Sequence, residues 1–461
     1  MKTIIDPQNA LADGLAAIRL KFQVPSDFPA DVLAAAEVAA QRAPSAHRDR
    51  TNQSFVTLDP ATSTDLDQAF TIEEAGSDLL LHYAIADVAW FVDDGDPVDI
   101  EAWKRGATIY LPDGKAGLYP PILAENAASL LPDGPRPAVV FTVRIDPDGQ
   151  ATLEGAERAI IRSRAKLAYD SVRMDQLPQG FAKLSRRIQS AELKRGAARV
   201  DPPEQEVNRN PDGSYSLLFR PRLASEDDNA ALSLATNLAV AATLQAHHTG
   251  LFRVMDGPND SAIKRLRFTA SAFGLTWPTE MPLEDFEKGL SADNAREAAF
   301  MMAIRRAGDG AAYVPYREGV TPWHAAMAAT YAHATAPLRR LADRYVVRAA
   351  LAVANGDPVP LAVSEAFTKL PEVMARADAL GAQVERSVID LAEAVMMQGE
   401  VGETFDAVVT DIDERGVRMQ LKDMPVVARV QARGTDPGDV IQVKLNRVDL
   451  ANRALEFQRM S

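Results

Sequence analysis

The sequence predicts an α+β fold, in which a mixed β-sheet body with packed helices is followed by a small five-stranded barrel. Short β-like runs at 55–58, 79–86, 108–111 and 139–145 are separated by turns rich in Asp, Gly and Pro. From about residue 166 the apolar spacing changes to the helical period. Strands followed by helices favour an α+β body over a doubly wound sheet.

Helices are predicted both before and after the strands. Residues 1–50 are rich in alanine, and 31–43 (DVLAAAEVAAQRA) follows a proline-containing turn, which favours a short helical module at this end of the chain. The longer helices have apolar residues at helical spacing. They are expected at 229–246, 295–306, 338–354 and 363–397.

The pattern changes again near residue 400. Five short β-like runs follow, at 405–410, 416–421, 426–431, 440–448 and 454–457. Five strands in so short a segment favour an OB-type barrel, a shape often used for single-stranded nucleic acid, although another small β-barrel or SH3-like module fits the same pattern. We therefore divide the chain into a helical module (1–50), a catalytic body (51–398) and a barrel (399–461).

Composition limits the classes of function. The 461 residues exceed a single core, and the absence of cysteine excludes disulfides, thiolate zinc sites and cysteine nucleophiles. We expect a cytoplasmic protein, because the start of the chain lacks a secretory signal and the apolar run 229–250 is interrupted by polar residues. The net charge of −14 argues against a simple nucleic-acid binder, but an enzyme can hold a locally basic channel inside an acidic shell.

The densest group of candidate catalytic residues lies at 57–70 (TLDPATSTDLDQAF). Asp59 ends a β-run, and Asp65 and Asp67 are two residues apart, so an extended segment puts both carboxylates on one face. Mg²⁺ prefers such oxygen ligands and can activate water toward a phosphodiester. The spacing alone also fits an acidic surface turn in which Asp65 caps a helix, and both interpretations stay open.

A second group lies at 331–351 (YAHATAPLRRLADRYVVRAAL). Pro337 suits a first helical position, which places Arg339 and Arg340 in the first turn of the predicted helix. Basic residues oppose the usual charge preference there, and a bound phosphate resolves the conflict. The alternative is that both arginines pair with local acids such as Asp343.

Together these segments resemble the ribonuclease II/ribonuclease R family, which has an RNB catalytic domain and a C-terminal S1 domain. The family pattern D-x5-D-x-D-D-A is matched by Asp59, Asp65, Asp67 and Ala69. The pattern Y-x-H-F-T-S-P-I-R-R-Y-x-D is matched by Tyr331, His333, Thr335, Pro337, Arg339, Arg340 and Asp343. Further stretches at 85–88, 105–112 and 165–170 resemble the family in the same order, and the likeness covers about residue 48 to the end.

The resemblance implies processive 3′-to-5′ hydrolysis of single-stranded RNA to nucleoside 5′-monophosphates. It implies Mg²⁺ as the cofactor, with Mn²⁺ as a substitute, and an RNA partner that enters by its 3′ end. No nucleotide cofactor and no membrane partner are expected, and the protein is expected to be a monomer.

The resemblance also implies roles for individual residues. The metal ligands would be Asp59, Asp65 and Asp67, with Gln68 at the family's fourth aspartate position. Asp67 is the carboxylate most needed for cleavage, Asp65 assists it, and Arg339 holds the scissile phosphate. The implied RNA-binding residues are Tyr110, Tyr169, His333, Arg340 and Arg253. Core packing is the alternative role for Tyr110, Tyr169 and His333.

The chain departs from the family pattern in three places. Gln68 can offer an amide oxygen to a metal but brings no charge, so we expect either a lower metal affinity or a neighbour such as Asp87 in place of the missing carboxylate. Ala230 and Ala231 stand where the family has acidic residues that help to select ribose, and Asp227 or Asp228 is the candidate replacement. The segment before residue 50 is too short for the two cold-shock barrels that the family usually carries.

These departures keep two other functions open. A catalytically impaired RNA-binding protein of the same fold is the alternative motivated by Gln68. A metal-dependent hydrolase of single-stranded DNA is the alternative motivated by Ala230 and Ala231.

Overall fold

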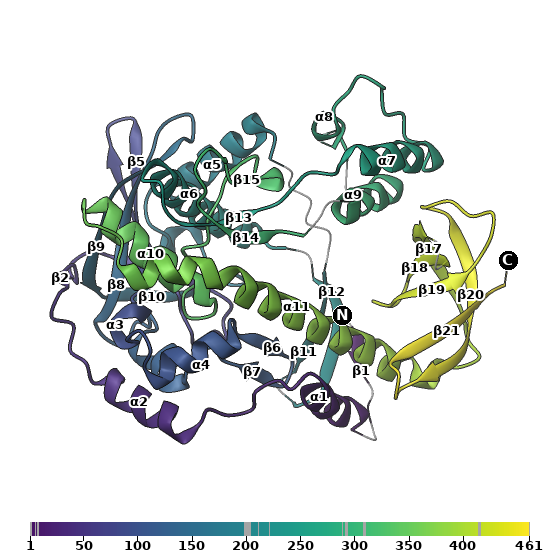
Figure 1. The fold of residues 1–461 in the computed structure, drawn as a ribbon. Coiled ribbons are helices and arrows are strands. Elements are labelled where there is room, and N and C mark those ends of the chain that lie inside the picture. The colour runs from purple at the N-terminus through teal and green to yellow at the C-terminus, as the bar shows by residue number, and fades with distance from the viewer. Residues whose placement is uncertain are drawn as a thin grey trace.

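The main body is built on a mixed seven-stranded sheet with strand order β10-β3-β4-β5-β8-β9-β2 (Figure 1). The computed structural model describes residues 2–4, 6, 9–197, 204–210, 212–220, 222–287, 289–290, 294–307, 310–413 and 416–460. The sheet strands are β2 (Arg48–Asp49), β3 (Phe55–Asp59), β4 (Gln68–Ala75), β5 (Asp78–Ala86), β8 (Arg136–Ile145), β9 (Ala151–Ile161) and β10 (Ser163–Ala168).

The centre of the sheet is antiparallel and its two edges are parallel. Strands β3 to β9 pair antiparallel in turn, whereas β10 pairs parallel with β3 and β2 pairs parallel with β9. The central strand β5 (DLLLHYAIA) is buried along almost its whole length, which is the pattern of a strand covered on both faces. The pairing of β10 with β3 brings Ala168 opposite Asp59. The end of β10 therefore lies beside the start of the predicted carboxylate loop.

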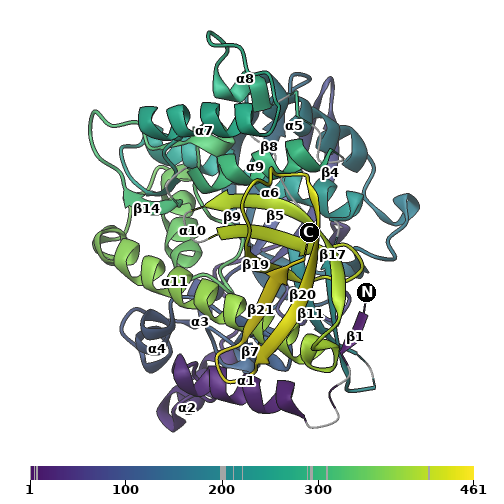
Figure 2. The same ribbon diagram turned by 90° about the vertical axis from the view of Figure 1, so that its right-hand side faces the viewer.

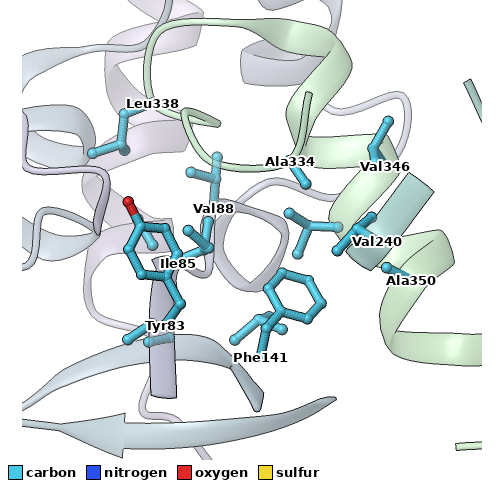
Figure 3. Packing of buried hydrophobic residues seen from close by; sticks show 14 of the residues in the cluster. Tyr83, Ile85, Val88, Phe141, Val240, Ala334, Leu338, Val346 and Ala350 are labelled. Atoms are coloured by element: carbon cyan, nitrogen blue, oxygen red, sulfur yellow. The ribbon is translucent and has the colours of Figure 1, made fainter. Parts of the chain in front are cut away.

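Helices α6 (Ala224–Ala246) and α10 (Leu341–Ala354) cover the sheet and form its core. Both helices contact β9 and each other, and α6 also contacts β5 and β8. Figure 3 shows Phe141 of β8 packed among Val240 of α6 and Val346 of α10. This burial of apolar surface from three distant segments is the main force that holds the body together.

Helix α11 (Leu361–Met397) connects the body to the barrel (Figure 1). It contacts α10 and β14 in its first part and α1 further along. Its last residue, Met397, is part of the barrel core. The 37-residue helix therefore contacts the body, the N-terminal helix α1 and the barrel.

The first fifty residues pack into the body instead of forming a core of their own. Helix α1 (Ala10–Lys21) buries Leu11 and Leu15 against α11, and α2 (Ala30–Ala40) buries Val32 in the main core. Two short strands are also present, β1 (Lys2–Ile4) on β12 and β2 on β9. The sequence pattern indicated only helices here, because strands this short carry no periodic signal.

The C-terminal segment forms a closed barrel with strand order β17-β18-β19-β21-β20 (Figure 2). Its strands are β17 (Thr404–Asp413), β18 (Gly416–Leu421), β19 (Val427–Gln431), β20 (Val440–Asp449) and β21 (Ala454–Arg459). All five lie where the sequence predicts strands, so the predicted α+β body with a five-stranded barrel is confirmed. The domain boundaries at residues 50 and 398 stay a prediction.

The remaining elements connect these parts. A satellite lobe of α7 (Asp260–Ala272), α8 (Leu283–Glu287) and α9 (Ala295–Ala307) has its own small core around Phe273 and Phe300. The other helices are α3 (Val88–Phe91), α4 (Pro97–Arg105) and α5 (Phe181–Arg195), with short turns η1 (Leu123–Ala127), η2 (Met174–Gln176), η3 (Ala325–Met327) and η4 (Gln398–Glu400). The other strands are β6 (Ile109–Leu111), β7 (Gly114–Ala116), β11 (Glu204–Arg209), β12 (Tyr215–Arg220), β13 (Leu251–Val254), β14 (Ala312–Pro315), β15 (Trp323–His324) and β16 (Ala329–Thr330). Among the described residues, none of the helices combines the length and the apolar character needed to cross a membrane.

A buried carboxyl group joins α11 to the barrel. Oε1 of Glu393 accepts hydrogen bonds from the side chain of Gln205 in β11 (2.6 Å) and from the backbone N–H of Val427 in β19 (2.7 Å). Burial raises the pKa of Glu393 to about 7, and the two hydrogen bonds offset only part of that shift.

We predict that Glu393 makes the folded protein less stable as the pH rises. Its pKa is higher in the folded state than the ordinary 4.5, so the folded state binds the proton more tightly. Relative to Glu393→Gln, the wild-type free energy of unfolding should fall between about pH 4.5 and about pH 7 and then level off. Urea unfolding of both proteins across this range measures the difference. A difference that is constant with pH would contradict the prediction.

Candidate active site

The carboxylate of Asp67 lies at the centre of the candidate site. It is 5% exposed, at the entrance to β4, and its Oδ1 accepts a hydrogen bond from the backbone N–H of Leu338 (2.7 Å). Its Oδ2 lies 3.5 Å from Nε of Arg339. Burial raises the pKa of Asp67 to about 8, against the opposing effects of Arg339 and the Leu338 N–H. The two predicted motifs therefore meet at this side chain.

Asp59, at the end of β3, is influenced by the same positive charge as Asp67, that of Arg339. Burial raises its pKa to about 7, while the positive charge of Arg339 lowers it and the charge of Asp65 raises it. No donor among the described residues forms a hydrogen bond with its buried Oδ2. A buried carboxylate oxygen without a partner is costly, and a cation would satisfy it.

Asp65, unlike Asp59, has both of its carboxylate oxygens paired, and both partners lie in one hairpin. Its Oδ1 forms an ion pair with Nζ of Lys115 (2.9 Å), and its Oδ2 accepts a hydrogen bond from the hydroxyl of Tyr110 (3.2 Å). Tyr110 and Lys115 are directly opposite each other in the hairpin of β6 and β7. The structure therefore places Tyr110 at the site, with 53% of its surface exposed, and links it to a predicted metal ligand.

Gln68 opens β4, and its side chain faces the same buried region. Its Oε1 accepts a hydrogen bond of 2.5 Å from the hydroxyl of Tyr83. Tyr83 lies in the apolar core, and Figure 3 shows its hydroxyl at the edge of the cluster near Leu338. The amide oxygen of Gln68 is therefore close to the carboxylates, but it already has a donor.

The residues present fit a hard divalent cation in their chemistry. Burial raises the pKa values of the Asp59 and Asp67 carboxyls, and one buried oxygen of Asp59 has no hydrogen-bond partner among the described residues, so a cation would stabilise both groups. Within the described residues, however, no three acidic or histidine side chains are gathered closely enough to enclose a metal. The predicted trio of Asp59, Asp65 and Asp67 is not gathered around one point, because Asp65 is held by Lys115.

Arg339 and Arg340 have different environments. The structure starts α10 at Leu341, so both arginines precede the helix instead of lying in its first turn as predicted. Backbone pairing with the 106–108 segment explains the difference, since Thr108 N–H donates to the carbonyl of Arg339 and Leu341 N–H to that of Gly106. Arg340 makes two hydrogen bonds to Asp343 (2.9 and 2.8 Å), which was the alternative for this residue. Arg339 stays 45% exposed beside Asp67.

Tyr169 lies beside Asp59, at the end of β10. Its backbone N–H donates to the carbonyl of Asp59, and its hydroxyl accepts a hydrogen bond from Asn229 (2.9 Å). Asn229 is buried at the start of α6, next to Ala230, and is therefore the polar residue that α6 contributes here. The candidate replacements for the missing acids are engaged elsewhere, Asp227 with Arg222 (3.0 Å) and Asp228 with Ser185 (2.5 Å).

Two other predicted RNA-binding residues lie in an aromatic cluster. Nδ1 of His333 is hydrogen-bonded to the hydroxyl of Tyr313 (2.7 Å), and its ring packs edge-on against Tyr331. Burial and the nearby arginines hold the pKa of His333 well below its usual range, so the imidazole is neutral. The guanidinium of Arg253 stacks 4.5 Å from the Tyr313 ring centroid and pairs with Asp378 (3.0 Å).

Asp87, the suggested substitute for the fourth carboxylate, is not available to a metal in this structure. Its Oδ2 accepts a hydrogen bond from Nε of Arg158 (2.8 Å) and lies 3.0 Å from Nε2 of His47. Sequence reasoning missed Lys115, Asn229 and Tyr313 at the site. An Asp113-Gly114 pair, a common hairpin signal, follows the predicted strand at 108–111 and would have indicated a hairpin here. It would not have given the register, because the turn in the structure is Pro112-Asp113, with Leu111 paired to Gly114 and Tyr110 to Lys115.

Residues 47–355 match the model of the RNB domain, and residues 403–460 match the RNase II-type exonuclease C-terminal S1 domain. The chain belongs to the RNB family. The predicted family is therefore confirmed over most of the chain, and the match ends where α10 ends.

Curated proteins named ribonuclease R match most of this chain. Ribonuclease R of Aquifex aeolicus is 26% identical over 442 residues, which cover 87% of this chain and 61% of the relative. Ribonuclease R of Escherichia coli is 24% identical, and the match covers 88% of this chain and 56% of the relative. The chain therefore spans less than two thirds of the length of these curated relatives.

Solved structures confirm the RNB fold. Mycoplasma genitalium RNase R in complex with ribose methylated single-stranded RNA superimposes with a TM-score of 0.87 at 20% identity, covering 100% of this chain and 79% of that one. Yeast Ssd1, described as a pseudonuclease, superimposes with a TM-score of 0.68 at 17% identity, covering 92% of this chain and 56% of that one. The same fold thus occurs in a protein described as a pseudonuclease.

We predict that the two neighbouring arginines differ sharply in their effect on stability. Arg340→Ala leaves the fully buried carboxylate of Asp343 without its cation and should cost about 3 kcal/mol. Arg339→Ala removes a half-exposed side chain and should cost less than about 1 kcal/mol. Urea unfolding of the two variants measures both values. Equal losses would contradict the assignment of Arg340 to structure and of Arg339 to the site.

Proposed function

We propose that this chain is a divalent-metal-dependent exoribonuclease that hydrolyses single-stranded RNA processively from its 3′ end and releases nucleoside 5′-monophosphates. The observation that carries the proposal is the contact of Asp67 with both Leu338 and Arg339. This contact joins a buried carboxylate to a half-exposed guanidinium, and the positive charge of the same guanidinium also lowers the pKa of Asp59. Membership of the RNB family and the S1-type barrel agree with an RNA substrate.

We assign Asp59, Asp65 and Asp67 to Mg²⁺ or Mn²⁺, with Gln68 beside them. Their oxygens suit a hard cation, and burial raises the pKa values of Asp59 and Asp67, a cost to the charged carboxylates that such a cation would relieve. A bound divalent cation would supply an activated water and polarise the phosphodiester.

The chain's own residues would position the RNA. The exposed guanidinium of Arg339 is free to orient the scissile phosphate and to offset the charge that develops on it. Asp67, fixed by the Leu338 N–H, holds that guanidinium in place. Tyr110 offers an exposed ring on which a terminal base can stack, while its hydroxyl stays on Asp65.

Other predicted contacts receive weaker support. Tyr169 is held by Asn229 beside Asp59 and is in reach of a nucleotide that approaches the carboxylates. His333 and Arg253 lie in the Tyr313 cluster, where neutral and stacked side chains suit contact with bases. Arg340 supports the site through Asp343 in place of direct RNA contact. We retain the division at residues 50 and 398, a cytoplasmic location and a monomeric state as parts of the proposal.

One assay tests the proposed activity. We expect 5′-labelled single-stranded RNA to shorten from its 3′ end with Mg²⁺ or Mn²⁺ and to stay intact in EDTA. Asp67→Asn should lower the rate by at least about 100-fold, because it removes a charge at the reacting phosphate. Asp175→Asn is the matched control, since that carboxylate pairs with Arg173 on the surface (3.1 Å), and it should retain the wild-type rate.

The other outcomes distinguish the alternatives. Binding of the RNA without cleavage under any metal would support a catalytically impaired RNA-binding protein, which Gln68 and the likeness to a pseudonuclease keep under consideration. Equal degradation of single-stranded DNA of the same sequence would contradict selection of ribose. That result would point to Ala230 and Ala231 as the reason.

A further inference from the structure

Lys115 is the charged residue at the site to which no role has yet been given. Its ammonium lies between two carboxylates, 2.9 Å from Oδ1 of Asp65 and 3.2 Å from Oε1 of Glu125. Its side chain is only partly exposed, so the pair is shielded from bulk water more than a surface ion pair. Glu125 in turn is fixed by a hydrogen bond from Thr64 (2.9 Å).

The hairpin that carries Lys115 is held firmly. Ile109 and Leu111 of β6 pack in one apolar cluster with Leu15 of α1. At the turn, Nη2 of Arg19 forms an ion pair with Oδ1 of Asp113 (2.8 Å). The N-terminal helix α1 therefore fixes the position from which Lys115 reaches Asp65.

We propose that the ammonium of Lys115 pairs with Asp65 while no metal is bound. When a divalent metal binds Asp65, the Lys115 side chain moves and its ammonium pairs with Glu125 alone. The proposal rests on the proposed function, because it takes Asp65 as a metal ligand. Two cations that share a single carboxylate repel each other strongly in a partly buried site, so the metal and Lys115 compete for Asp65.

Glu125 makes the exchange possible. A buried ammonium without a carboxylate is costly, but Lys115 already contacts Glu125, and its flexible four-carbon stem permits a short shift toward it. The sequence departs from the family pattern at the adjacent Gln68, which removes one negative charge. Lys115 adds one positive charge. Both residues therefore make the net charge of the site less negative and weaken its attraction for a divalent cation.

The proposal predicts opposite and non-additive effects on metal affinity. Lys115→Met frees Asp65 and should tighten Mn²⁺ binding about tenfold. Glu125→Gln removes the second carboxylate for the ammonium and should weaken Mn²⁺ binding about threefold. The double variant should bind Mn²⁺ as tightly as Lys115→Met alone, because Glu125 acts only through Lys115.

Titration of the metal-free full-length proteins with Mn²⁺, followed by the electron paramagnetic resonance of the free ion, measures these affinities without any turnover. Lys166→Met is the matched control. The ammonium of Lys166 lowers the pKa of Asp59 but donates to the carbonyl of Ala61 (2.8 Å), so its loss frees no bond to a carboxylate oxygen. We expect a clearly smaller gain in affinity from Lys166→Met than from Lys115→Met.

Three results would overturn the proposal. Additive effects, with the double variant only about threefold tighter than the wild type, would show that Lys115 and Glu125 act only through a general electric field, while the metal site itself stands. Equal gains from Lys166→Met and Lys115→Met would lead to the same conclusion. Absence of Mn²⁺ binding in the wild type and in every variant would instead contradict the metal centre of the proposed function.

Discussion

The organisation of the candidate site depends on one hydrogen bond, from the backbone N–H of Leu338 to the buried carboxylate of Asp67, which joins residues 271 positions apart in the chain. The bond fixes the start of β4 against the segment that carries Arg339, and the cores on both sides hold the two segments in place. A buried carboxylate needs such a donor. Burial raises the pKa of Asp67 against the opposing effects of the Arg339 guanidinium, 3.5 Å away, and of this N–H.

The cations beside these carboxylates come from distant parts of the chain. Asp59 shares the guanidinium of Arg339 with Asp67, while Asp65 takes its cation from the hairpin of β6 and β7. The hairpin is held by α1, so the first fifty residues act on the site although they contain no predicted site residue. The N-terminal module therefore helps to hold the hairpin that carries Lys115 in place.

Most of the fold followed from local patterns. The barrel strands and the helices α6, α9, α10 and α11 lie near their predicted positions because each has a clear apolar period. The strands β1, β2, β4, β7 and β9 to β16 were missed, among them the 11-residue β9. Strand formation depends on partners that only the tertiary structure supplies. At the site, the meeting of the two motifs followed from family resemblance. The partners of the individual side chains followed only in part. Arg340 pairs with Asp343, which the sequence offered as an alternative. The pairing of Asp65 with Lys115 depends on the register of the β6–β7 hairpin, which residue spacing does not reveal.

The most direct measurement of the central claim is the position of Mn²⁺ by anomalous scattering from a crystal of this protein. The account predicts a peak bounded by Asp59 and Asp67, beside Arg339, with the carboxylate of Asp65 released from Lys115. A peak at a position remote from these residues, or no peak in crystals soaked at a saturating Mn²⁺ concentration, would contradict it.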